Sequence, residues 1–97
     1  MNNLKQNQED LIKMADIQKI VTRGQEIYQK IRTQYEPKEN GKFLAIEVDN
    51  EKEFLGNTSA DVLELAKKEF PDKVFYVVKI GSASAEIMAR TTSRNEE

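Results

Sequence analysis

The chain has 97 residues, with 15 Lys and Arg against 17 Asp and Glu, and it contains no Cys and no His. This length suits one domain, and the net charge of -2 provides no overall basic field for nucleic acid. The missing residue types exclude disulfides, thiolate nucleophiles, Cys-ligated metals and Ser-His-Asp catalysis.

The N-terminal residues are polar and contain no apolar signal segment. The longest apolar run, Val74–Val78, is far shorter than the ~20 residues that span a bilayer. We therefore expect a cytoplasmic protein that has no membrane partner.

From Ile17 to Tyr35, apolar residues recur with the i, i+3, i+4, i+7 spacing of an amphipathic helix, which should end before Pro37. The stripe can be extended back to Met14 and Leu11. Two starts fit the pattern. A cap at Asp16 would leave residues 1–15 flexible, whereas a cap at Asn7 would make them part of a longer helix. Gly24 lies on the apolar stripe, which indicates that the helix backbone packs closely under a neighbour.

The next segments alternate between strand and helix patterns. Residues 42–48 and 53–55 predict two strands joined by a hairpin loop. Thr58 or Ser59 then caps a short helix, and residues 74–80 form the most strand-like segment of the chain. The order α-β-β-α-β predicts an α+β fold, in which a three-stranded antiparallel sheet of order 2-1-3 packs with two helices, the first of them long.

We assign residues 16–81 to the single domain and predict a mobile polar tail at 82–97, because that segment has little apolar surface to bury. A short extra strand near Glu86–Ala89, anchored by Ile87 and Met88, is the alternative for this tail.

Both faces of the predicted sheet are apolar. Alternation along the strands places Leu44, Ile46 and Val48 on one face, and Phe43, Ala45, Phe75 and Val77 on the other. Two arrangements are open. The first helix covers the second face to give three layers, or both helices share one face and the second face binds another chain. In the second arrangement, Phe75→Asp would disrupt assembly and leave the monomer folded.

The first helix is also longer than the sheet that it covers. A helix from about residue 8 to 35 is roughly 40 Å long, whereas a seven-residue strand spans about 23 Å. Leu11, Ile12 and Met14, with Ile17 at the boundary, would then overhang the sheet and be free to meet a partner helix.

No residue pattern indicates catalysis, a cofactor or a metal. Glu47 and Asp49 alternate at a strand end, with Glu51 and Glu53 close by. Asp49, Asn50, Glu51 and Glu53 are too few for a calcium loop and lack its Gly, so this segment is typical of a solvated hairpin tip. The three tyrosines are explained by core packing with a solvated hydroxyl. We therefore expect a protein that is not an enzyme.

One stretch resembles a known group. The pattern consists of Gly41-Lys42-Phe43-Leu44-Ala45-Ile46, a hairpin, Phe70-Pro71-Asp72, and a strand that ends in Lys79-Ile80-Gly81. It is similar to that of a group of small prokaryotic α+β proteins of unknown function. The resemblance covers about residues 16–81, and the chain departs from the group after Gly81. It implies the fold and transfers no catalytic residue.

These features favour a small protein-binding module, of an antitoxin-like or regulatory-subunit kind, that contacts another protein or a second copy of itself as a homodimer. The residues expected to bind the partner are Leu11, Met14, Phe43, Ala45, Phe75 and Val77. The alternative is a nucleic-acid-associated regulator that uses the polar face of the first helix through Lys19, Arg23, Lys30 and Arg32.

Overall fold

The computed structural model describes residues 2–82 and 84–89, with the side chains of residues 2–15 and of Ala89 outside the described part. Its elements are helix α1 (Asn2–Tyr35), strands β1 (Phe43–Glu47) and β2 (Lys52–Gly56), helix α2 (Ser59–Glu69), and strands β3 (Val74–Lys79) and β4 (Ala85–Ala89). The strands form one antiparallel sheet in the order β2-β1-β3-β4. The predicted α+β class is confirmed, as is the 2-1-3 order of the first three strands.

Strand β4 corrects the prediction of three strands. It lies within the predicted mobile tail and pairs with β3 from Val74↔Ala89 to Val78↔Ala85. Its side chains alternate between the two faces of the sheet. Ile87 packs against the hydrophobic cluster on one face, and Met88 packs against the cluster on the other. Contacts on both faces and the ladder with β3 thus hold this short strand. Residues 90–97 of the predicted tail lie outside the described residues.

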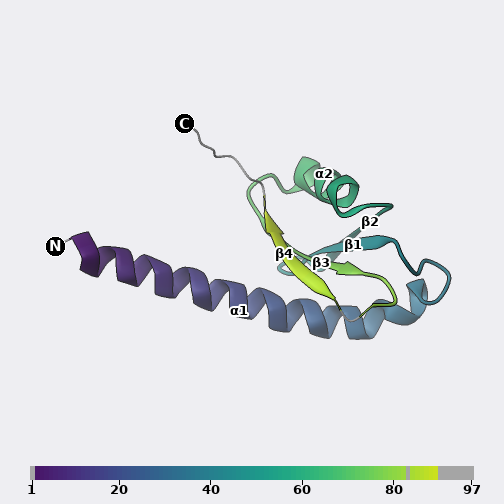
Figure 1. The fold of residues 1–97 in the computed structure, drawn as a ribbon, viewed down its shortest axis with the longest axis horizontal. Coiled ribbons are helices and arrows are strands. Elements are labelled where there is room, and N and C mark those ends of the chain that lie inside the picture. The colour runs from purple at the N-terminus through teal and green to yellow at the C-terminus, as the bar shows by residue number, and fades with distance from the viewer. Residues whose placement is uncertain (1, 83, 90–97) are drawn as a thin grey trace.

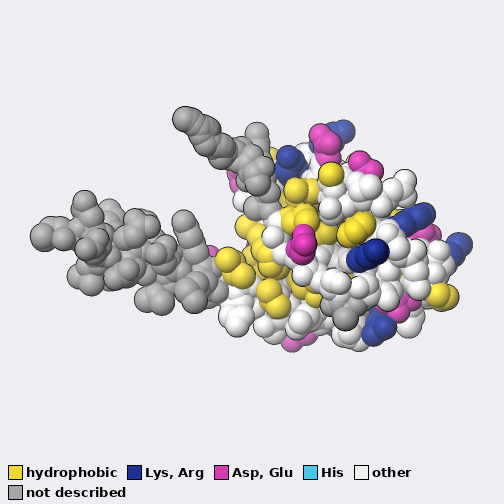
Figure 2. Space-filling model, viewed as in Figure 1, with side chains coloured by type: hydrophobic (Ala, Val, Ile, Leu, Met, Phe, Trp, Pro, Cys, Tyr) yellow, Lys and Arg dark blue, Asp and Glu magenta, His cyan; other side chains and the backbone are white. Residues whose placement is uncertain are grey.

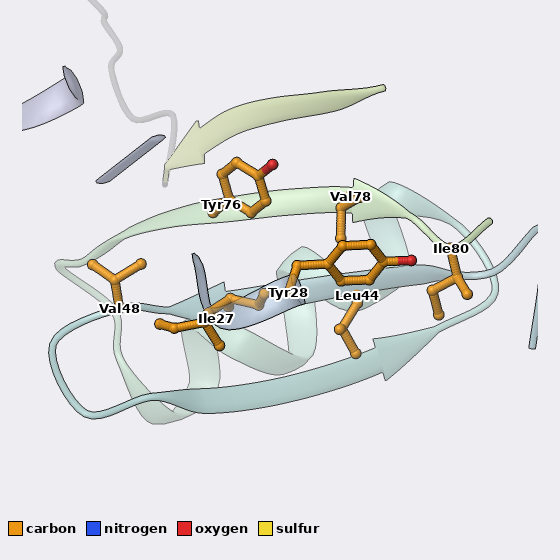
Figure 3. Packing of buried hydrophobic residues seen from close by; sticks show 8 residues of the cluster. Ile27, Tyr28, Leu44, Val48, Tyr76, Val78 and Ile80 are labelled. Atoms are coloured by element: carbon orange, nitrogen blue, oxygen red, sulfur yellow. The ribbon is translucent and has the colours of Figure 1, made fainter. Parts of the chain in front are cut away.

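The molecule has three layers, with α1 on one face of the sheet and α2 on the opposite face (Figure 1). The cluster beneath α1, here called the α1-side core, joins two helix residues to alternate residues of β1 and β3 and to the residue that follows each strand. Figure 3 shows these side chains spread along one face of the sheet. Its buried members are Ile27, Tyr28, Leu44, Ile46, Val48, Tyr76, Val78 and Ile80.

The α2-side core fills the other face and contains Ala45, Val62, Ala66, Phe75 and Val77. The arrangement in which both helices share one face is therefore wrong. In the three-layer arrangement, α2 and not α1 covers the second face. The reason is the connection of α2, which joins β2 to β3 across the intervening β1 and so must lie over one face. The predicted cap is at Thr58, whose Oγ1 accepts a hydrogen bond of 3.0 Å from the amide of Asp61.

The expected close approach at Gly24 is confirmed. Gly24 is buried, and a Cβ added there would lie 2.7 Å from the Cβ of Tyr76 and closer still to its ring. The absence of a side chain at this position allows the backbone of α1 to rest directly on β3.

Helix α1 determines the length of the molecule. Its 34 residues correspond to about 51 Å at 1.5 Å per residue, and the longest dimension of the chain is 54 Å against 28 Å for the next. The helix begins at Asn2, upstream of both starts considered from the sequence. In Figure 1 its N-terminal half extends well past the sheet.

Candidate interaction surface

The structure divides the predicted partner-binding residues into two groups. Ala45, Phe75 and Val77 are at most 3 % exposed beneath α2, and Phe43 packs against the same core. Ala45, Phe75 and Val77 form no free surface on the folded chain, because α2 covers them, whereas Phe43 is half-buried. Leu11 and Met14 lie in the N-terminal half of α1, and their side chains are outside the described part.

Ile17 marks the point at which α1 leaves the sheet. It is 46 % exposed, although it precedes Gly24 by seven residues and so lies on the same side of the helix. Ile27, further along the helix, is only 2 % exposed. The sheet-facing stripe of α1 therefore continues beyond the sheet and presents an apolar side chain to solvent.

The adjoining edge of the sheet is strand β4, which carries half-buried apolar side chains. A hollow of about 160 Å³ lies between α1 and β4, and Tyr76 of β3 also lines it. Its other lining residues are Val21 and Gln25 of α1 and Ala85, Glu86 and Ile87 of β4. Figure 2 shows hydrophobic side chains gathered over this region and beside the place where α1 leaves the sheet. We call Ile17, Val21 and the outer edge of β4 together the α1–β4 surface.

A second and more polar hollow, of about 480 Å³, lies between α1 and the β3–β4 turn. Tyr28, Arg32 and Gly81 line this hollow. The Tyr28 hydroxyl donates to Glu36 Oε2 at 2.5 Å and accepts from the Gly81 amide at 3.3 Å, while Arg32 Nη2 donates to Glu36 Oε1 at 3.0 Å. The Tyr28 hydrogen bond, followed by Arg32, lowers the pKa of Glu36. Burial, followed by the bond to Glu36, raises the pKa of Tyr28. The Tyr28 hydroxyl therefore keeps its proton at neutral pH, and its bond with Gly81 ties the end of α1 to the β3–β4 turn.

The hairpin carboxylates have separate structural roles. Glu47 is 1 % exposed, and its Oε1 accepts from the backbone amide of Asn50 at 2.9 Å and from the Asn50 side chain at 2.8 Å. Lys73 Nζ lies 2.5 Å from Asp49, and its hydrogen bond lowers the pKa of Asp49. Glu53 accepts from the Tyr35 hydroxyl. In the described ranges, no group of three or more potential ligands is placed to hold a metal.

The polar face of α1 is partly neutralised. Arg23 contacts Glu26 at 3.1 Å and Glu51 at 2.6 Å, and Arg32 is paired with Glu36. Two of the four cations proposed for nucleic-acid contact are therefore already engaged with carboxylates. This pairing reduces the positive charge available on this face, on which phosphate binding depends.

Sequence reasoning gave the β4 strand only as the alternative at Glu86–Ala89 and did not include its edge in the predicted binding surface. The signal was present in Ile87 and Met88, whose adjacent positions suit a strand that contacts both faces of a sheet. It was outweighed by the polar residues on either side of them.

Comparison with protein-family models finds no match, and comparisons with curated proteins and with solved structures find none either. The resemblance to small prokaryotic α+β proteins therefore stays a prediction. In the part of the chain that the structure describes, neither helix combines the length and the hydropathy needed to traverse a bilayer.

Proposed function

We propose that this chain is a protein-binding module that uses the α1–β4 surface, and that it acts as a regulatory subunit and not as an enzyme. The observation that carries the proposal is the exposure of Ile17 on the sheet-facing stripe of α1. A helix that continues past its own sheet with apolar residues on that stripe is suited to pack against another chain.

The sequence of the projecting part supports the same role. Leu11, Met14 and Val21 lie three and seven residues apart, so they fall on one side of the helix. Val21 lies at the β4 side of α1, so this side of the helix leads from the projecting half directly to the edge of the sheet.

The polar groups that could take part in a reaction are engaged in structural contacts, which favours binding over catalysis. Tyr28 and Tyr35 each donate to a carboxylate at 2.5 Å, and Arg23 and Arg32 are paired with acidic residues. The bonds from Arg23 to Glu51 and from Tyr35 to Glu53 join α1 to the hairpin. Glu36, the partner of Tyr28 and Arg32, directly follows α1, so these two contacts hold the end of the helix. Each group therefore has a structural role that needs no reaction.

The test compares two variants with the same kind of change at equal exposure. Ile17→Asp places a charge on the α1–β4 surface, and Leu65→Asp does so on α2, where Leu65 is 45 % exposed. Chemical cross-linking in the native lysate, followed by mass spectrometry, should capture a stoichiometric partner or a second copy with the unchanged chain and with Leu65→Asp, but not with Ile17→Asp. Equal capture by both variants would refute the assignment of this surface. Both variants should stay folded, because exposed substitutions usually change stability by no more than about 0.5 kcal/mol.

A further inference from the structure

The two edges of the sheet differ in how well they are protected. Edge strands usually carry Lys, Pro or irregularities that prevent pairing with another chain. Strand β2 contains Lys52, which contacts Glu69 of α2, and ends at Gly56. Strand β4 reads Ala85-Glu86-Ile87-Met88-Ala89 and has no Lys, Arg, Pro or Gly. Within the described residues, no strand pairs with the outer side of β4.

The register shows which backbone groups face this open side. The Lys79 amide donates to the Ser84 carbonyl at 3.4 Å, so these two residues form a hydrogen-bonded pair next to the β3–β4 turn. Hydrogen-bonded pairs alternate along an antiparallel ladder. The backbone groups of Glu86 and Met88 therefore bond to β3, and those of Ala85, Ile87 and Ala89 point outward.

We propose that a second copy of this chain pairs with β4, antiparallel and centred on Ile87, so that two four-stranded sheets become one. The proposal rests on the proposed function and names its partner. Rotation about a two-fold axis at Ile87 sets Ala85 opposite Ala89 of the second copy and Ile87 opposite its own counterpart. All three outward-facing residues then find partners at once, with about six main-chain hydrogen bonds from three pairs.

The strand is complementary to itself in size and charge. The symmetric pairing puts Glu86 opposite Met88 of the second copy, so no like charges are directly opposed. An interface in which one patch meets its own copy is the usual way in which soluble homodimers form. An unrelated extended segment could bond to the same backbone groups, but its side chains would not in general complement those of Ala85–Ala89 as the symmetric pairing does.

The helix on the same face enlarges the contact. Stable interfaces bury about 1,200–2,000 Å², which is more than five-residue strands alone can supply. Val21 and Ile87 line the same hollow, and the exposed Ile17 lies one helical turn beyond Val21. A copy seated on β4 therefore brings its own α1 alongside these apolar residues.

The absence of cysteine allows a direct test of register. In the Ile87→Cys variant, the two introduced thiols would sit on facing Cα atoms about 5.5 Å apart, inside the usual disulfide range of about 4.4–6.8 Å. In the matched Ala85→Cys variant, the two positions would be four residues out of register, about 13 Å along the strand. Mild oxidation should give a covalent dimer with Ile87→Cys and at least ten times less with Ala85→Cys. Equal cross-linking of the two variants, or none with either, overturns the proposal.

Light scattering after size exclusion provides a second readout that does not depend on a substitution at Ile87. The full chain should elute at twice its 11.2 kDa mass. Ala85→Pro should elute as a folded monomer, because proline at the first residue of an edge strand removes an outward N–H and spares the inner ladder. A monomeric full chain at every concentration overturns the self-pairing. If Ile17→Asp still abolishes capture of another protein in that case, the proposed binding function stands without it.

Discussion

Gly24→Ala tests whether the contact between α1 and β3 decides the stability of the domain. Two effects of opposite sign compete. Alanine is favoured over glycine in a helix interior by about 1 kcal/mol, so an uncrowded site would become more stable. At Gly24 the new methyl group would lie 2.7 Å from the Cβ of Tyr76. That atom is fixed to the backbone of β3 and has no rotamer by which to move away.

The helix itself must therefore shift, and overpacking of this kind costs about 1–3 kcal/mol. We expect a net loss of about 1–2 kcal/mol, which corresponds to a melting temperature lowered by several degrees in a domain of this size. The assay is thermal and urea unfolding followed by circular dichroism, at a fixed protein concentration because self-association would make the midpoint concentration-dependent. Gln25→Ala, at the next and exposed position, is the control and should change little. A rise in stability for Gly24→Ala would refute the reasoning.

Three further predictions concern other buried or half-buried groups. Glu47→Gln should lower the free energy of unfolding by about 1–3 kcal/mol, because an amide nitrogen would face the hairpin N–H donors from which the buried carboxylate now accepts. Urea unfolding, with the exposed Asp49→Asn as the control, measures this loss. Equal stabilities of the two variants would contradict it. Phe75→Asp should leave no folded monomer, because the side chain is fully buried beneath α2. A near-ultraviolet circular dichroism spectrum of this variant that matches the unchanged chain would contradict this expectation. Burial, followed by the bond to Glu53, raises the pKa of Tyr35 to about 12. The folded state thus holds this proton more tightly than the unfolded chain, so stability is fully present below about pH 10 and declines as the pH rises through 12. Tyr35→Phe should weaken that decline in pH-dependent melting, and an unchanged profile would count against the assignment.

Short-range patterns determined the parts of the fold that were predicted correctly. The alternation in β1 and β3 defines which residues share a face, and the part of the predicted stripe from Ile20 to Tyr35 defines the buried side of α1. Gly24 also belongs here, because an isolated glycine on an apolar helix stripe has few explanations other than close packing. Each of these features can be recognised within a few residues of sequence.

The layer order could not be derived in this way. Both faces of the sheet are apolar, so the pattern of Phe43, Ala45, Phe75 and Val77 is the same whether a helix of this chain or another molecule covers it. The choice depends on where the crossover from β2 to β3 passes, which is a property of the whole topology. The partner-binding assignment of these residues followed from that ambiguity. Strand β4 was underestimated for a related reason, since its stability comes from pairing with β3 and not from its own composition.

In an interface on the α1–β4 surface, the edge of β4 would fix the register of the partner, and α1 would supply most of the buried area. Main-chain pairing along β4 fixes direction and register but buries little area, whereas the apolar side of α1 adds area but tolerates several orientations. Because both lie on the same side of the domain, with Val21 and Ile87 lining one hollow, a single partner can use them together. Such a partner must present an antiparallel strand and an apolar helix in the same relative placement. A second copy of the chain meets that requirement through its own α1 and β4, which is why the register of β4 is the most informative property to measure.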